Sequence, residues 1–252
     1  MPSIAELRAV TQPDELLSRP AQEHWAGRLY MRRLSPYLTR ALLGTPLSAN
    51  AVTALMIPAG LLGALALTFP GLVAAIVAVL FIQLQLLLDC SDGEVARWRR
   101  TTSPKGIYLD QVAHYSTEAA LAAALGVRAD GGWDSIGGWT ALGLLVAALI
   151  LMLKSETHLV GLALARSGRA VMPTQPEEGG RRLSLRQGAR LLPFLRPFQA
   201  VDASLLALAA AIVDLFVEGI RATQVLLVAL VAAAIVAVVG HLLAVLASDR
   251  LR

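Results

Sequence analysis

The chain has 252 residues, of which 56% are hydrophobic and 16% charged, and its mean hydropathy is +0.62. An intrinsically disordered chain combines low hydrophobicity with high charge, so this composition excludes one. A single cysteine, Cys90, excludes a small fold held together by disulfides within the chain. The composition is typical of an integral membrane protein, in which the net charge of +4 is explained by topology and by anionic lipid headgroups. We therefore expect membrane lipids, and no nucleic acid, as partners.

Residues 1–45 form a predicted cytoplasmic segment that precedes a membrane domain of residues 46–252. Within this segment, residues 23–38 place Trp25, Tyr30 and Tyr37 among Arg28 and Arg32. Aromatic side chains interleaved with basic ones are typical of a helix that lies at the membrane–water interface. The sequence thus predicts an N-terminal cytoplasmic amphipathic helix.

Six stretches have the length and apolar character that a helix needs to cross a bilayer, about 20 residues. They are residues 46–69, 71–88, 107–127, 138–165, 198–217 and 223–247. The third contains Asp110, His114 and Glu118, whose four-residue spacing places them on one helix face that can point into a cavity. The predicted fold is all-α, a polytopic membrane protein with six transmembrane helices that form one domain.

The basic residues predict the orientation of these spans. Of the 22 Lys and Arg residues, all except Arg128, Lys154 and Arg221 fall in segments that six spans would place on one side. Because the side rich in Lys and Arg is normally cytoplasmic, we expect both termini in the cytoplasm and a multi-pass protein of the cell membrane.

Ionisable side chains gather where the second span passes into the third. Asp89 and Asp92 are three residues apart, and Asp110 and His114 are four apart, so each pair shares a helix face. Two antiparallel helices joined by a short turn bring these pairs together on the cytoplasmic side. Carboxylates that lie so close repel one another unless a cation lies between them. Oxygen ligands without cysteine favour Mg²⁺ or Mn²⁺, which commonly bind substrate phosphates.

Small residues accompany the acidic ones. Gly93 and Ala96 lack bulky side chains, so a planar or phosphate-bearing group can approach the helix backbone closely at these positions. Together with the acidic cluster, they predict a site that handles phosphate groups.

The arrangement Asp-x2-Asp-Gly-x2-Ala-Arg-x8-Gly-x3-Asp-x3-His resembles the motif of the CDP-alcohol phosphotransferase (CDP-alcohol phosphatidyltransferase) family. Seven of its eight positions match at the family spacing: Asp89, Asp92, Gly93, Ala96, Arg97, Gly106 and Asp110. The segment that begins with Asn50 and ends with Thr53 is similar to the family's Asn-x2-Thr element at the start of the first span.

This resemblance implies an integral membrane enzyme. It would transfer a substituted phosphate group from a CDP-linked alcohol, such as CDP-diacylglycerol, to a hydroxyl acceptor, with release of CMP, in phospholipid or related lipid biosynthesis. The resemblance also implies a homodimer and two divalent ions, Mg²⁺ or Mn²⁺. By the same comparison, Asp89, Asp92 and Asp110 would hold the ions on the donor diphosphate. Gly93, Ala96 and Gly106 would leave room for the nucleotide, and Asn50, Thr53 and Arg97 are further candidates for nucleotide or phosphate contacts.

The last motif position departs from the family, because His114 stands where the family has Asp. A neutral imidazole can accept a proton from an acceptor hydroxyl, so His114 is a candidate catalytic base beside Asp110. It is also a candidate metal ligand. The remaining alternative is a catalytically impaired membrane protein that binds CDP-alcohols without turnover.

Further polar residues lie within the later spans. Either Lys154, Glu156 and His158 line an acceptor pocket, or Lys154 extends its amine to the membrane surface while Glu156 and His158 pair within the helix bundle. We expect structural or interfacial roles for Glu118, Asp202 and Asp214, and a hydrogen bond within the bundle for His241.

Overall fold

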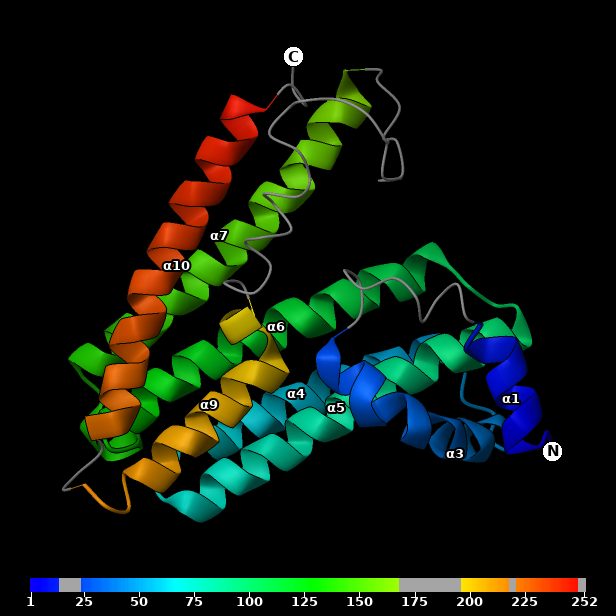
Figure 1. Ribbon diagram of the computed structural model, residues 1–252, viewed down its shortest axis with the longest axis horizontal. Helices are drawn as coiled ribbons and strands as arrows, with labels where there is room; N and C mark the ends of the chain where they lie inside the picture. Colours follow the sequence, from blue (N-terminus) through cyan, green and yellow to red (C-terminus); the bar gives the residue numbers. More distant parts are fainter. Residues whose placement is uncertain (14–23, 168–195, 218–220, 249–252) are drawn as a thin grey trace.

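The computed structural model describes residues 1–13, 24–167, 196–217 and 221–248. Within these ranges the regular structure is helical and contains no strand, which confirms the all-α prediction. The helices lie against one another along much of their length, and α7 and α10 run side by side at an angle to the other helices (Figure 1).

The N-terminal part of the chain forms two separate helical pieces. Helix α1 spans Ile4–Thr11 and begins with a capping box, in which Ser3 and Glu6 exchange side-chain and backbone hydrogen bonds. After the first gap in the described residues, the π-helical turn η1, Gly27–Met31, leads into α3, Arg32–Leu43. The predicted interfacial helix at residues 23–38 therefore extends further along the chain, to Leu43, and its first residue, Glu23, lies outside the described residues.

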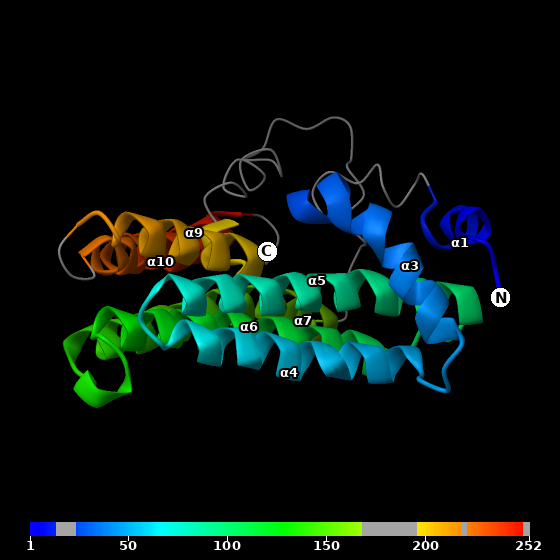
Figure 2. The same cartoon turned by 90° about the horizontal axis from the view of Figure 1, so that it is seen from below.

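Three long helices carry the motif residues. Helix α4 spans Ala49–Leu67, α5 spans Leu72–Arg99 and α6 spans Pro104–Ala129. Figure 2 shows the three helices side by side, with α3 and α1 over the C-terminal end of α5. Helix α5 continues well past the apolar stretch that ends at Leu88, so Asp89 and Asp92 lie on the helix itself.

The turn between α5 and α6 is short because both helix ends are well defined by their sequence. Arg100 closes α5 in the left-handed conformation, with φ at 55°. Ser103 caps α6 by accepting a hydrogen bond from Gly106 N, and Pro104 occupies the first helical position, where its missing N–H costs nothing. The prediction of two antiparallel helices joined by a short turn is confirmed.

The rest of the chain completes the bundle. After the short η2, Trp133–Ser135, helix α7 spans Gly138–Arg166. A second short turn, η3 at Arg196–Phe198, precedes α9, Ala200–Val213, and α10 spans Arg221–Ala247. Helix α9 is therefore shorter than the predicted span at residues 198–217.

Four of the described helices are long and apolar enough to cross a membrane: α4, α5, α7 and α10. Helix α6 carries Lys105, Asp110, Glu118 and Arg128, and α9 has only 14 residues, so neither is among them. The structure thus supports a membrane protein with four spanning helices, and six spans remain a prediction.

Glycines allow the long helices to approach closely. A Cβ on Gly126 of α6 would lie 2.9 Å from the Cα of Gly143 of α7. On α4, a Cβ at Gly60 would overlap Thr117 of α6, which also accepts a hydrogen bond from Gln85 of α5. Small residues commonly permit such close packing between membrane helices. These contacts fix α6, which carries Gly106, Asp110 and His114, against its neighbours.

Candidate metal centre

Three side chains from two helices converge at one end of the bundle. Asp89 projects from α5, and Asp110 and His114 project from successive turns of α6. The Nε2 atom of His114 lies 3.4 Å from an oxygen of Asp89 and 3.3 Å from an oxygen of Asp110. One ligand atom from each residue lies within 4.8 Å of the other two, and each side chain is partly exposed.

Asp92 occupies a different position from these three. It lies on α5 and accepts a hydrogen bond of 2.5 Å from the hydroxyl of Thr53 on α4. Asp92 is outside the cluster formed by Asp89, Asp110 and His114. The structure therefore brings together three of the four predicted ligands and shows that Thr53 orients the fourth.

Asn50 and Gly106 are neighbours across the α4–α6 contact. The hydroxyl of Ser103 donates a hydrogen bond to the side-chain oxygen of Asn50, at 3.1 Å. A Cβ on Gly106 would lie only 2.8 Å from the same oxygen. Glycine at this position therefore lets α6 begin directly beside Asn50.

Gly93 and Ala96 have close protein neighbours in the structure. A Cβ on Gly93 would meet the two terminal nitrogens of Arg97, at 3.1 and 3.2 Å. Ala96 packs against an apolar cluster to which α3, α4, α5 and α6 all contribute and which includes Val52 and Met56. The absent side chain of Gly93 thus lets the Arg97 guanidinium lie close to the backbone of α5, and space for a nucleotide remains a prediction.

The donor atoms of the cluster suit a divalent cation. Two ligands at adjacent corners of an octahedral Mg²⁺ site, with bonds of 2.0–2.1 Å, lie roughly 3 Å apart. The distances of 3.3 and 3.4 Å from His114 to the two carboxylates are close to this separation. Carboxylates suit Mg²⁺ and Mn²⁺, whereas an imidazole nitrogen suits transition metals. The mixed set of ligands therefore fits a divalent ion such as Mg²⁺ or Mn²⁺.

A comparison with protein families agrees with this chemistry. The model of the family described as CDP-alcohol phosphatidyltransferase matches residues 47–245, which include α4 through most of α10. The chain belongs to the CDP-alcohol phosphatidyltransferase family. Members transfer phosphate groups from CDP-alcohols to alcohol acceptors in membranes and generally depend on divalent metals. The sequence has no significant match among curated proteins.

In this member of the family, the sequence pattern did not single out Glu94. This residue lies between the motif positions Gly93 and Ala96 and is fully buried. Its carboxylate accepts hydrogen bonds from Ser35 and Thr39 of α3. The four-residue spacing of Ser35 and Thr39, which forms a polar stripe on one helix face, was the signal that could have indicated a buried acceptor.

The polar residues deeper in the bundle form pairs. Lys154 of α7 lies 2.8 Å from the buried carboxylate of Glu118 and stacks on the ring of Tyr115 at 5.2 Å. Glu156 of α7 pairs with His241 of α10 at 3.0 Å. These contacts confirm the pairing interpretation for Glu156, whereas Lys154 pairs with Glu118 instead of extending to the membrane surface.

His158 is close to the same group, because its ring lies 5.8 Å from that of Tyr115. Asp202 also has a structural role, since it accepts hydrogen bonds from Trp25 and pairs with His24. The expected structural roles of Glu118, Asp202 and His241 are therefore confirmed.

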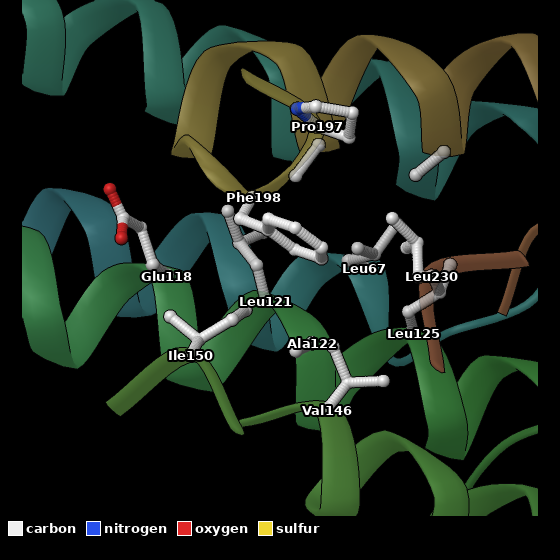
Figure 3. A pocket seen from close by; sticks show the side chains of 12 residues that line it. Leu67, Glu118, Leu121, Ala122, Leu125, Val146, Ile150, Pro197, Phe198 and Leu230 are labelled. Atoms are coloured by element: carbon white, nitrogen blue, oxygen red, sulfur yellow. The ribbon is translucent and has the colours of Figure 1, made fainter. Parts of the chain in front are cut away.

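An apolar cavity lies beside this polar group and apart from the metal cluster. Figure 3 shows Phe198, Leu121 and Leu230 around it, with the Glu118 carboxylate at one edge. Neither Asp89, Asp110 nor His114 lines the cavity. The candidate metal ligands therefore lie outside this cavity, in the partly exposed cluster between α5 and α6.

Proposed function

We propose that the protein is a divalent-metal-dependent membrane enzyme that transfers a substituted phosphate group from a CDP-linked alcohol to a hydroxyl acceptor and releases CMP. The observation that carries this proposal is the convergence of Asp89, Asp110 and His114, whose ligand atoms lie within 4.8 Å of one another in a chain of this family. Phosphoryl transfer needs positive charge at the donor phosphates and little covalent chemistry from the protein.

The carboxylates hold the metal ions in this proposal. Asp89, Asp92 and Asp110 would hold a pair of Mg²⁺ or Mn²⁺ ions, which would supply the positive charge that the donor diphosphate and the leaving CMP need. The acceptor oxygen attacks the phosphorus that carries the transferred alcohol, and the bridging P–O bond to CMP breaks. Thr53 holds the Asp92 carboxylate through its hydrogen bond.

His114 has one of two roles at this site. Its Nε2 atom is near enough to both carboxylates to serve as a ligand to the same ion. Alternatively, the imidazole accepts the proton that the acceptor hydroxyl loses, as a catalytic base beside Asp110. Replacement of the histidine separates the two roles, because loss of a ligand weakens metal binding and loss of a base does not.

The nucleotide binds beside the metal ions, against the first turn of α6 and the adjoining faces of α4 and α5. Asn50 is turned toward Gly106 there, and Arg97 lies over Gly93. The proposal gives Gly93, Ala96 and Gly106 the role of leaving space for the cytidine nucleotide, and Asn50, Thr53 and Arg97 the role of contacting it.

The proposal also includes the topology. Six helices cross the membrane, both termini and the metal cluster lie on the cytoplasmic side of the cell membrane, and two copies associate as a homodimer. On the N-terminal side, Leu29, Leu34 and Tyr37 are exposed on η1 and α3. Exposed apolar side chains next to Arg28 and Arg33 support a position at the membrane interface.

The test is an assay of CMP release by purified protein. The protein is incubated with CDP-diacylglycerol, Mg²⁺ or Mn²⁺, and a pool of polyol, polyol-phosphate and lipid acceptors. An Asp92→Ala variant is the blank, because it removes one carboxylate. We expect metal-dependent CMP release well above this blank, and its absence with every donor and acceptor would contradict the proposal.

A second function rests on one observation, the histidine at the last motif position. If His114 cannot replace the family's Asp, the protein binds CDP-alcohols without turnover. Metal-dependent binding of CDP-diacylglycerol without CMP release, together with gain of release in His114→Asp, would favour this alternative.

A further inference from the structure

We propose that α1 is a positioning element of the donor site: it holds the Arg97 side chain so that its guanidinium lies over Gly93, beside the space proposed for the donor nucleotide. The inference rests on the proposed function, since it assigns α1 a part in donor binding. It is carried by two contacts between the C-terminal end of α1 and adjacent turns of the motif helix α5.

The first contact joins Arg97 to the end of α1. The Nε atom of Arg97 donates a hydrogen bond of 2.7 Å to the carbonyl oxygen of Thr11, the last residue of α1. The final carbonyls of a helix have no partner within it and carry partial negative charge, so a guanidinium satisfies them well. Because Nε makes this bond, the two terminal nitrogens are directed over Gly93.

The second contact lies one turn earlier on α5. Gln12, which follows α1 directly, donates a hydrogen bond of 2.7 Å from its side-chain nitrogen to the buried carboxylate of Glu94. The same nitrogen lies 2.9 Å from the carbonyl oxygen of Arg32, at the start of α3. Glu94 thus joins α1, α3 and α5 at a point beside Gly93.

Helix α1 depends on this docking for its own order. It has eight residues, and isolated helices shorter than about 12–15 residues are marginal in water. Its Leu7 is fully buried, whereas Val10 of the same helix is 53% exposed. Burial of Leu7 and the two hydrogen bonds therefore keep α1 in place, and undocking of α1 frees Arg97.

The expected consequence is an effect on donor affinity. A free arginine side chain samples many rotamers, and fixing it before the donor arrives reduces the entropy that binding must overcome. Arg97 is not among the residues of the metal cluster, so undocking α1 leaves the chemical step largely unchanged. The result is a higher KM for the donor with a nearly constant kcat.

The test compares two substitutions on the same short helix. Leu7→Asp places a charge at a buried position and undocks α1, and Val10→Asp places the same charge at an exposed one. We expect Leu7→Asp to raise the KM for CDP-diacylglycerol and the Kd of CDP with Mg²⁺ by about tenfold, the scale of one lost charge-assisted hydrogen bond. Val10→Asp leaves both unchanged, and Gln12→Ala gives a smaller increase of the same kind.

A double variant distinguishes positioning from general destabilisation. If α1 acts through Arg97, then Leu7→Asp has little further effect in an Arg97→Ala background, whereas independent effects multiply. Multiplicative effects, a fall in kcat with constant KM, or equal behaviour of Leu7→Asp and Val10→Asp would overturn the inference while the transferase stands. If the wild-type protein neither binds CDP nor releases CMP, the proposed function fails and this inference fails with it.

Discussion

Aspartates at the two ends of the helix bundle have different kinds of hydrogen-bond partner. At the end where α6 meets α7 and α9 meets α10, Asp130 and Asp214 each bind the N-terminus of the following helix. Asp130 accepts hydrogen bonds from Gly137 N and from the backbone and hydroxyl of Thr140, at 2.6–2.7 Å. Asp214 accepts from Ala222 N at 2.7 Å and from the hydroxyl of Thr223 at 2.6 Å. We call this the capped end.

At the other end, where α5 meets α6, the carboxylates face one another and His114. We call this the open end. Carboxylates that receive N–H groups from a helix N-terminus are already neutralised and serve the fold. Carboxylates that face other carboxylates repel one another until a cation binds, so they are available for chemistry. The hydrogen-bond partners of an aspartate, more than its depth in the bundle, therefore separate structural from functional positions.

The largest expected effect contrasts one aspartate from each end. Asp110→Asn at the open end removes a negative ligand without changing side-chain size, and we expect CMP release to fall by roughly a hundredfold or more, the scale of lost transition-state charge stabilisation. Asp214→Asn at the capped end keeps a side-chain oxygen that accepts hydrogen bonds. We therefore expect this variant to retain most of the CMP release per folded molecule. The assay is CMP release per folded molecule, and equal losses in the two variants would break the comparison.

His114 gives the second contrast. His114→Ala is expected to lower CMP release by about ten- to a hundredfold, because it removes a base or a ligand of the metal site. His114→Asp restores an all-oxygen set and recovers part of the activity, with a shift of preference from Mn²⁺ toward Mg²⁺.

The ratio of CMP release with the two metals and direct titration of each metal measure this shift. If His114→Asp leaves the metal preference unchanged, His114 is not a ligand of the metal ion.

Substitution of the two motif glycines is expected to weaken donor binding to different extents. In Gly106→Ala the new Cβ lies 2.8 Å from the Asn50 oxygen, which cannot move without losing its bond to Ser103. In Gly93→Ala the Cβ meets the tip of Arg97 at 3.1 Å, and a long side chain can shift. Overpacking typically costs roughly 1–3 kcal/mol. We therefore expect Gly106→Ala to raise the KM for the donor by about tenfold, and Gly93→Ala to raise it by less. Steady-state kinetics with CDP-diacylglycerol checks the order of the two variants.

The smallest effect belongs to the capped end and depends on pH. Burial raises the pKa of the Asp130 carboxyl, but the hydrogen bonds from Thr140, Gly137 and Trp139 together outweigh it and hold the pKa below its ordinary value of 3.8. A lowered folded-state pKa stabilises the fold above the unfolded value, and this contribution is lost as the pH falls through the folded value. The difference in Tm between wild type and Asp130→Asn should therefore be constant at neutral pH and narrow below about pH 4.

Thermal unfolding in detergent at a series of pH values measures this difference. A Tm difference that stays constant down to pH 3 would show that the Asp130 charge plays no part in the cap.

The open end was largely predictable from the sequence because its residues are local. The three- and four-residue spacings of Asp89, Asp92, Asp110 and His114 fix their helix faces, and a short turn then brings the two helices together. The prediction was less accurate for helix ends, since apolar content ends at Leu88 whereas α5 continues to Arg99. The helix ends where Arg100 adopts the left-handed conformation, and the hydrophobic pattern does not indicate this position.

The contacts that the sequence did not reveal join residues far apart in the chain. Glu94 meets Gln12, Ser35 and Thr39, and Arg97 meets the carbonyl of Thr11. Such pairs depend on how α1 and α3 pack on α5, which spacing along one helix does not determine. The Ser3–Glu6 spacing is the pattern of a capping box and was the signal that could have indicated the start of α1, but α1 has too few apolar residues to predict where it docks.

The most direct test of the account measures metal binding at the open end without any substrate. Mn²⁺ is titrated into wild-type protein, Asp89→Asn, Asp110→Asn and Asp214→Asn, and bound Mn²⁺ is followed by electron paramagnetic resonance. The account predicts saturable Mn²⁺ binding in wild type and Asp214→Asn, and weakening by about tenfold or more in Asp89→Asn and Asp110→Asn. Equal Mn²⁺ affinity in all four proteins, or no saturable binding in wild type, would contradict it.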